Sequence, residues 1–363
     1  VQFLVIANPW ELPDLDDAEQ FGNSNFISPL SLIYEAEKKM KFTRTFGSLF
    51  AEYDFSKAVK FRTQAGATFT GSKLQEFHSS NSLFGFRWNG RAVVRQVESS
   101  SYNISSTLRY MKTFNKKHWV NVLVGAEAAS YLWESFFNDV TGFENQSLGY
   151  NNIGLGQVFN DYGTSALPSN RISYFTSANY TLKGKYLFTA NFRADASDRF
   201  GSQNRWGYFP GAAFAWNAHK ESFIKNNIPQ INQLKIRASY GQTGNERIPP
   251  FTFAGGMENA FYASNDNLSF GLAPSSLENP NLKWETTTQF DIGLDVGLFD
   301  DRIHLTADYY NKQTTDMLIN APVPAQSGFN SQWQNLGALE NKGFELVLNL
   351  GVIRKNDYRW DVT

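Results

Sequence analysis

Residues 286–308 read TTTQFDIGLDVGLFDDRIHLTAD, and this stretch decides the fold class. From residue 290 to residue 298 apolar side chains alternate with polar residues or glycine, and the alternation resumes after the turn at 299–302. A period of two residues is that of a β-strand, so the stretch predicts a hairpin with one apolar and one polar face. Each apolar face continues for roughly ten residues, which is what a tilted strand needs to cross a bilayer.

The composition agrees with a strand-rich chain and excludes several classes of function. Aromatic residues make up 16% of the 363 residues, and 27 glycines accompany them, a mixture typical of strands joined by tight turns. A net charge of -1 without a Lys/Arg cluster excludes a nucleic-acid-binding surface. The absence of cysteine excludes disulfides, zinc–thiolate sites and thiol catalysis.

Hairpins of the same kind recur along the chain. The clearest has apolar residues alternating on both sides of the turn Lys183-Gly184-Lys185. Tight turns alternate with long polar segments such as 71–100 and 134–170, which we expect to be loops. Short turns at one end and long loops at the other are typical of an outer-membrane barrel, with the turns in the periplasm and the loops outside. We predict an extracellular loop region at 1–40 and transmembrane strands with their connections over 41–363.

The charged residues in the middle of the predicted strands all fall on the polar phase. An Arg or Lys that faced lipid near the bilayer midplane would cost about 2–4 kcal/mol, whereas a hydrated lumen accommodates it. The pattern therefore predicts that these residues line a watery lumen: Arg62, Arg109, Glu127, Arg193, Asp195, Arg237, Asp291, Asp295 and Glu345. Three aromatic residues of the predicted loops, Trp88, Phe329 and Trp333, are candidates for contact with cargo or a partner protein, or they pack the loops together.

Catalysis and metal binding find no support in the sequence. There is no G-x-S-x-G turn, and the four histidines are scattered. Asp291 and Asp295 lie about 13 Å apart on one strand, too far for a glycosidase pair. The acidic residues between 14 and 19 lack the spacing of a calcium loop. We expect no catalytic residue, no metal site and no cofactor.

Several runs of sequence carry a family resemblance, in order from about Arg171 to the end of the chain. They include DRFG at 198–201, LKIRASYGQTGN at 234–245, NPNLKWETT at 279–287 and NKGFE at 341–345. These runs resemble the SusC/RagA-type TonB-linked outer-membrane proteins of Bacteroidetes.

The resemblance implies a 22-stranded antiparallel barrel in the Gram-negative outer membrane, with its lumen filled by an N-terminal plug. It also implies a SusD-like surface lipoprotein as a lid, energy supplied through TonB, and import of oligosaccharides or peptides. By this comparison the chain holds about 12 of the strands, while the plug, the TonB box and the terminal strand are missing. We therefore expect both ends of the native protein to lie beyond this sequence.

Two other interpretations stay open at this point. One is a passive porin-like or surface-binding outer-membrane barrel without energy coupling. The other is a soluble extracellular carbohydrate-binding β protein, because sandwiches and propellers also alternate apolar and polar residues along their strands.

Overall fold

The computed structural model describes residues 33–264, 267–300, 302–354 and 358–362, and the statements below concern these residues. They divide into two compact units. The first unit comprises residues up to Ser48, Gly66–Tyr102 and Ser130–Pro168, and the second comprises Leu49–Ala65, Asn103–Ala129 and the chain from Ser169 onward.

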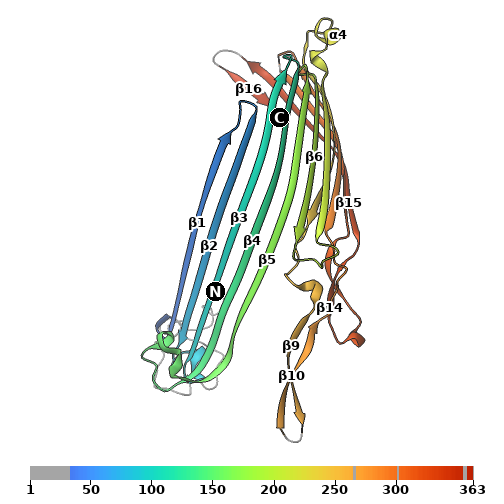
Figure 1. Ribbon diagram of the computed structural model, residues 1–363. Coiled ribbons are helices and arrows are strands. Elements are labelled where there is room, and N and C mark those ends of the chain that lie inside the picture. Colours follow the sequence, from blue (N-terminus) through green and yellow to red (C-terminus); the bar gives the residue numbers. More distant parts are fainter. Residues whose placement is uncertain (1–32, 265–266, 301, 355–357, 363) are drawn as a thin grey trace. The chain divides into compact units, whose positions relative to one another are not determined.

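Most of the described chain is β-strand (Figure 1). The strands are β1 (Ala36–Asp54), β2 (Val59–His78), β3 (Arg91–Phe114), β4 (His118–Phe143), β5 (Gly156–Leu182), β6 (Tyr186–Ser197), β7 (Trp206–Asn217), β8 (Ile231–Asn245), β9 (Gly256–Ser264), β10 (Asn267–Ser276), β11 (Glu285–Leu298), β12 (Ile303–Thr315), β13 (Leu318–Pro322), β14 (Ser331–Asn335), β15 (Ala338–Arg354) and β16 (Arg359–Val362). The helical segments are α3 (Leu83–Phe86), α4 (Ser222–Lys225), η2 (Gly149–Leu155), η3 (Ala218–Lys220), η4 (Thr252–Ala254) and η5 (Ala325–Ser327). Within the described ranges, no helix is long and apolar enough to cross a membrane.

Twelve strands form one sheet in the order β1-β2-β3-β4-β5-β6-β7-β8-β11-β12-β15-β16. The hairpins β9–β10 and β13–β14 lie outside this sheet. The hairpin that the sequence predicted first is β11–β12, whose antiparallel ladder runs from Leu298 opposite Ile303 to Thr286 opposite Thr315. The predicted all-β antiparallel fold is thus confirmed.

The tight turns have the backbone geometry that two-residue hairpins require. Lys183 and Gly184 have φ of 55° and 67°, and Asn115 and Lys116 have φ of 50° and 55°. Two successive positive φ angles give a type I′ turn, whose twist matches that of the paired strands. In the second unit, Figure 1 shows α4 at one end of β6 and the β9–β10 hairpin beyond the other end.

Several strands are longer than the sequence pattern predicts. The expected loops at 71–100 and 134–170 are largely strand, because β2 continues to His78 and β4 to Phe143. The expected boundary between the loop region and the first strand, after residue 40, is also wrong, because β1 begins at Ala36. The part of the expected loop up to residue 32 lies outside the described residues. In the segments 71–100 and 134–170 apolar residues do not keep to one phase, as at Ala92-Val93-Val94 and Phe136-Phe137, so the period-two signal is weak, whereas backbone pairing does not depend on that signal.

The apolar phase of the strands is the exposed one. Phe188, Phe192 and Leu346 are 46%, 43% and 71% exposed, whereas Asp195 on the polar phase is only 6% exposed. Buried apolar residues gather instead in two clusters, one in each unit: Phe77, Ala92, Val94, Val140, Phe143 and Tyr150, and then Phe200, Phe209, Ile248, Leu282 and Trp284. A soluble sandwich buries the apolar face of its sheets, so this arrangement argues against that alternative.

Glu221, between η3 and α4, ties together the turns at one end of the second unit. Its carboxylate accepts hydrogen bonds from Lys185 Nζ at 2.6 Å and from the Tyr186 hydroxyl at 2.8 Å. The ammonium group of Lys185, followed by the Tyr186 hydroxyl, lowers the pKa of Glu221. The pKa of Glu221 is thus lower in the folded protein than in the unfolded chain. Its contribution to stability is therefore complete at any pH above the ordinary glutamate pKa. That contribution is lost as the pH falls through the lower pKa of the folded protein.

We therefore expect these turns to loosen in acid, below the ordinary glutamate pKa of about 4.3. Hydrogen exchange of residues 183–185 and 217–221, corrected for the intrinsic effect of pH, should become faster there. In the control variant Glu221→Gln the exchange should already be faster at neutral pH. Its corrected rate should then show no additional increase in acid. An identical acid step in both proteins would assign the transition to another group.

Candidate functional site

A three-strand ion-pair bridge lies on the polar face of the second unit. Arg237 on β8 pairs with Asp295 on β11 at 3.3 Å and with Asp308 on β12 at 2.7 Å. Gly293 lies between them in register, opposite both Arg237 and Asp308. A Cβ atom on Gly293 would lie 2.4 Å from Arg237 Cζ and from Asp308 Oδ1. The bridge therefore passes over β11 only because this position carries no side chain.

The second group of predicted residues lies on β6. Arg193 donates from Nε to both carboxylate oxygens of Asp195 at 2.8 Å, and from Nη2 to Ser173 Oγ at 2.8 Å. Its guanidinium lies 5.4 Å from the ring centroid of Phe175. A guanidinium held by a carboxylate, a hydroxyl and an aromatic face is fixed in orientation.

Asp291 on β11 lies two residues before Gly293 and therefore on the same face of the strand. Its carboxylate accepts hydrogen bonds from Ser239 Oγ at 3.1 Å and from Gln289 Nε2 at 2.9 Å. Glu345 on β15 lies opposite Asp308 in register and lines the same hollow as Arg237 and Asp291. The structure thus brings six of the predicted residues to one face, on β6, β8, β11 and β15.

The other three predicted residues lie on earlier strands of the second unit. Glu127 is 3.6 Å from Arg171, which also pairs with Glu246 at 3.3 Å. Arg109 is exposed and donates to Asn121 Oδ1 at 2.7 Å. Arg62 is also exposed and lies 4.7 Å from the ring centroid of Phe50. No contact links Arg62 or Arg109 to the bridge at Arg237 within the described residues.

The three loop aromatics have different environments. Trp88 is 52% exposed, directly after α3. Phe329, after η5, is partly buried. Trp333 on β14 packs against the buried cluster of the second unit, and its carbonyl oxygen accepts from Asn279 Nδ2 at 2.8 Å. Of the two roles expected for these aromatic residues, Trp333 therefore has the one of packing the loops together.

The segment 279–285 holds the loops at this end together. Trp284 is buried and donates from Nε1 to the carbonyl oxygen of Arg205 at 2.9 Å. Asn335 accepts from the backbone N–H of Lys283 at 2.9 Å and donates to its carbonyl oxygen at 2.8 Å. The NPNLKWETT motif at 279–287 thus holds neighbouring loops together and places Trp284 in the buried cluster of the second unit.

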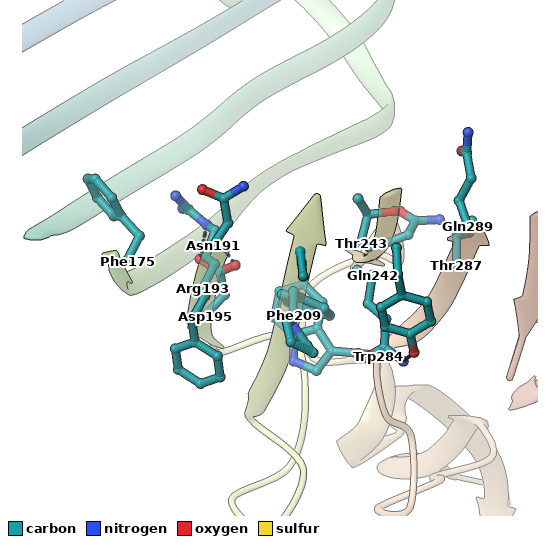
Figure 2. A pocket seen from close by; sticks show the side chains of 18 of the residues that line it. Phe175, Asn191, Arg193, Asp195, Phe209, Gln242, Thr243, Trp284, Thr287 and Gln289 are labelled. Atoms are coloured by element: carbon teal, nitrogen blue, oxygen red, sulfur yellow. Dashed lines mark hydrogen bonds and ion pairs between the residues drawn. The ribbon is translucent and has the colours of Figure 1, made fainter. Parts of the chain in front are cut away.

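An open pocket of about 1220 Å³ lies on the polar face of the second unit (Figure 2). Asn191, Arg193 and Asp195 lie on one side of it and Thr287 and Gln289 on the other. Phe209 and Trp284 form one end, with ring centroids 5.5 Å apart. A pocket lined by ion pairs, carboxamides and hydroxyl groups suits a polar ligand.

Reading the sequence identified three charged members of this pocket, Arg193, Asp195 and Asp291, but missed its other charged residues and its aromatic end. Phe209 faces the pocket although Tyr208 next to it follows the apolar phase. A Cβ atom on Gly244 would lie 2.0 Å from Phe209 Cζ, so the ring depends on that glycine. The one signal in the sequence was an aromatic residue on the polar phase between Gly207 and Gly211.

Clustered metal ligands do not occur in the described ranges: no group of three His, Asp or Glu side chains there is placed to hold an ion. Several charged groups of the pocket instead bind one another or neutral neighbours, as Arg193 binds Asp195 and Asp291 binds Ser239. This arrangement suits the binding and passage of a polar molecule.

Comparison with known proteins agrees with this arrangement. The family described as "TonB dependent receptor-like, beta-barrel" matches residues 6–363. TonB-dependent receptor P26 of Formosa agariphila is 33% identical over an alignment of 366 residues, which covers 99% of this chain and 35% of that protein. TonB-dependent receptor SusC of Bacteroides thetaiotaomicron is 32% identical over 80% of this chain and 28% of its own length.

A solved structure, described as the RagAB peptide transporter, matches with a TM-score of 0.80 and 26% identity. The match covers 90% of this chain and 36% of that one. The chain therefore spans about a third of the length of these relatives. TonB-dependent receptors are outer-membrane proteins of Gram-negative bacteria, and they are transporters rather than enzymes. The chain belongs to the TonB-dependent receptor family and is part of the β-barrel of a SusC/RagA-like member.

Proposed function

We propose that the whole protein is an energy-coupled importer of oligosaccharides or peptides, driven through TonB and working with a SusD-like surface lipoprotein. The observation that carries this proposal is the contrast between the two faces of the strands. The apolar side chains on one face are exposed, as Leu346 is. The charged side chains on the other face form ion pairs with one another, as Arg237 does with Asp295 and Asp308. Such a wall faces lipid on one side and a hydrated passage on the other.

In this proposal the nine charged residues predicted from the sequence line the passage. The long connections, together with the region before β1, lie outside the cell and the tight turns lie in the periplasm. Trp88 and Phe329, which are at least partly exposed, are the loop aromatics that contact cargo or the lipoprotein. The description of RagAB as a peptide transporter supports peptides as one cargo class.

The test is uptake by cells that produce the full-length protein. Labelled oligosaccharides and peptides should accumulate, a protonophore should stop their accumulation, and the lipoprotein should co-purify in mild detergent. Deleting the upstream segment that contacts TonB should abolish uptake without removing the protein from the outer membrane. Uptake that persists after both treatments would assign the protein to the passive porin-like or surface-binding class instead.

A further inference from the structure

Three neighbouring connections of the second unit bring together lysines that are far apart in the sequence. They are the β3–β4 turn, the β5–β6 turn and the connection from β7 to β8, which holds α4 (Figure 1). The amide N–H of Lys183 donates to the carbonyl oxygen of Lys117 at 2.6 Å, and that of Asn217 to the carbonyl oxygen of Lys185 at 2.7 Å. The turns are therefore fixed side by side.

These connections carry a large excess of positive charge. Residues 112–118, 183–185 and 217–225 contain seven lysines and one acidic residue, Glu221. The lysines form what we call the lysine patch: Lys112, Lys116, Lys117, Lys183, Lys185, Lys220 and Lys225. Adjacent hairpin turns of a sheet are about 10 Å apart, so each ammonium group lies within reach of the next turn.

Most of this charge is not neutralised by the protein. Glu221 is taken up by Lys185, at 2.6 Å. Lys220 donates to the carbonyl oxygen of Gly184 at 3.1 Å, which leaves its charge uncompensated. The exposed side chains of Lys117 and Lys183 have no ion pair with the described residues. The patch therefore presents ammonium groups that are free to bind an anion.

The excess is confined to these three connections and is not general to the tight turns. At the β1–β2 turn, Lys60 pairs with Glu52 at 2.5 Å and with Asp54 at 3.5 Å. The β11–β12 turn has the sequence Phe299-Asp300-Asp301-Arg302, with two acidic residues and one basic residue. The turns on either side of the patch are thus balanced or acidic.

One lysine of the patch lies on the apolar face of the sheet. Lys112 follows Ile104 and Leu108 on the same phase of β3, close to the end of the strand. Its Nζ lies 5.2 Å from the ring centroid of Phe114, which is exposed. A lysine in such a place keeps its methylene groups among apolar surroundings and extends its ammonium group to the polar boundary of the bilayer.

Aromatic residues mark the same boundary on the neighbouring strands. Tyr186 at the start of β6 and Trp216 near the end of β7 stack with ring centroids 6.5 Å apart. Phe223 on α4 is 57% exposed. Tyr and Trp gather where hydrocarbon meets the headgroups of a membrane. The lysine patch therefore lies at the depth of the lipid phosphates.

We propose that the lysine patch binds the phosphate groups of anionic phospholipids in the leaflet at the tight-turn end of the barrel. Each exposed ammonium group offers three N–H donors to phosphate oxygens, and its attraction to an anionic surface is strongest within a Debye length. A water-soluble acidic partner would account for the turns alone, whereas Lys112 and Phe114 lie on the face that meets hydrocarbon. The inference goes beyond the import proposal and takes from it only that the apolar face meets lipid.

The test uses the full-length protein in mild detergent with equal amounts of phosphatidylglycerol, which is anionic, and phosphatidylethanolamine, which is zwitterionic. Native mass spectrometry, which counts the bound molecules of each, should show a preference for phosphatidylglycerol. Lys117→Gln combined with Lys183→Gln should reduce this preference about 3–10-fold, because two exposed cations on adjoining turns are lost. Arginine at the same two positions should preserve it. Phosphatidylglycerol should also slow hydrogen exchange of residues 115–118 and 183–185 in the unchanged protein.

The matched control is Lys283→Gln combined with Lys342→Gln. It removes the same charge from two exposed lysines that are already paired, with Asp316 at 2.9 Å and Glu340 at 3.7 Å, and should leave the preference nearly unchanged. No preference in the unchanged protein, or an equal loss in both double variants, would overturn the phospholipid site. A preference that survives Lys117→Gln with Lys183→Gln would overturn it too and assign the patch to an acidic periplasmic protein.

The outcome is separable from that of the import proposal, because lipid binding requires neither cargo nor TonB. Energy-dependent uptake without a preference for phosphatidylglycerol would overturn this inference alone. The preference without energy-dependent uptake would overturn the import proposal alone.

Discussion

Arginine in place of Ala190 should destabilise the protein by about 2–4 kcal/mol, whereas arginine in place of Asn191, the next residue, should cost far less. Ala190 lies in the middle of β6 on the exposed apolar phase, between Ala178 and Ala212 on the neighbouring strands. A guanidinium there must be moved into hydrocarbon. Asn191 points to the polar pocket, opposite Gly211, where a guanidinium stays hydrated.

The measurement is the free energy of unfolding of each full-length variant in urea, after insertion into lipid vesicles. Because the two positions are adjacent on one strand, strand propensity and depth in the bilayer are nearly matched. Equal costs, or a larger cost at Asn191, would mean that the two faces of the sheet have been assigned the wrong way round. Such a result would remove the basis of the import proposal as well.

The second large effect is expected at the bridge over Gly293. Arg237→Met should cost about 1–3 kcal/mol, because it leaves the carboxylates of Asp295 and Asp308 on either side of Gly293 without a cation. The lower part of this range allows for the partial exposure of the groups, whose side chains are 34%, 14% and 22% exposed for Arg237, Asp295 and Asp308.

Gly293→Ala should destabilise the protein in the same way, since its Cβ must push Arg237 and Asp308 apart. The matched control is Gly241→Ala on the neighbouring strand, which adds the same methyl group into open space and should leave the stability nearly unchanged. The double variant Arg237→Met with Gly293→Ala should cost less than the two single changes together, because both break one interaction. Full additivity would show that Gly293 has a role independent of the bridge.

Reading the sequence identified the strand type, the two faces and the alternation of connections, because each depends on local pattern. The β11–β12 hairpin and the turn at Lys183-Gly184 are where the period and the turn residues indicate. The family motifs extended this reading to a class of transporter. The ends of β2, β4 and β5 were missed, because strand pairing continues where the alternation of side chains stops.

The partners of the charged residues depended on the register of the whole sheet. Arg237 meets Asp295 and Asp308, which are 58 and 71 residues further along the chain, and no local pattern specifies that pairing. The same holds for Trp333: the sequence left contact with cargo or packing between loops open for it, and the fold packs it against buried residues of distant segments.

The period-two alternation by itself determined that this chain forms a sheet with one apolar and one charged face, because side-chain direction in a strand follows from backbone geometry alone. Only the tertiary structure decided that Arg237, Asp295 and Asp308 would meet across Gly293. Such a site is set by how three strands align, and a shift of one residue in any of them would turn its side chains to the other face.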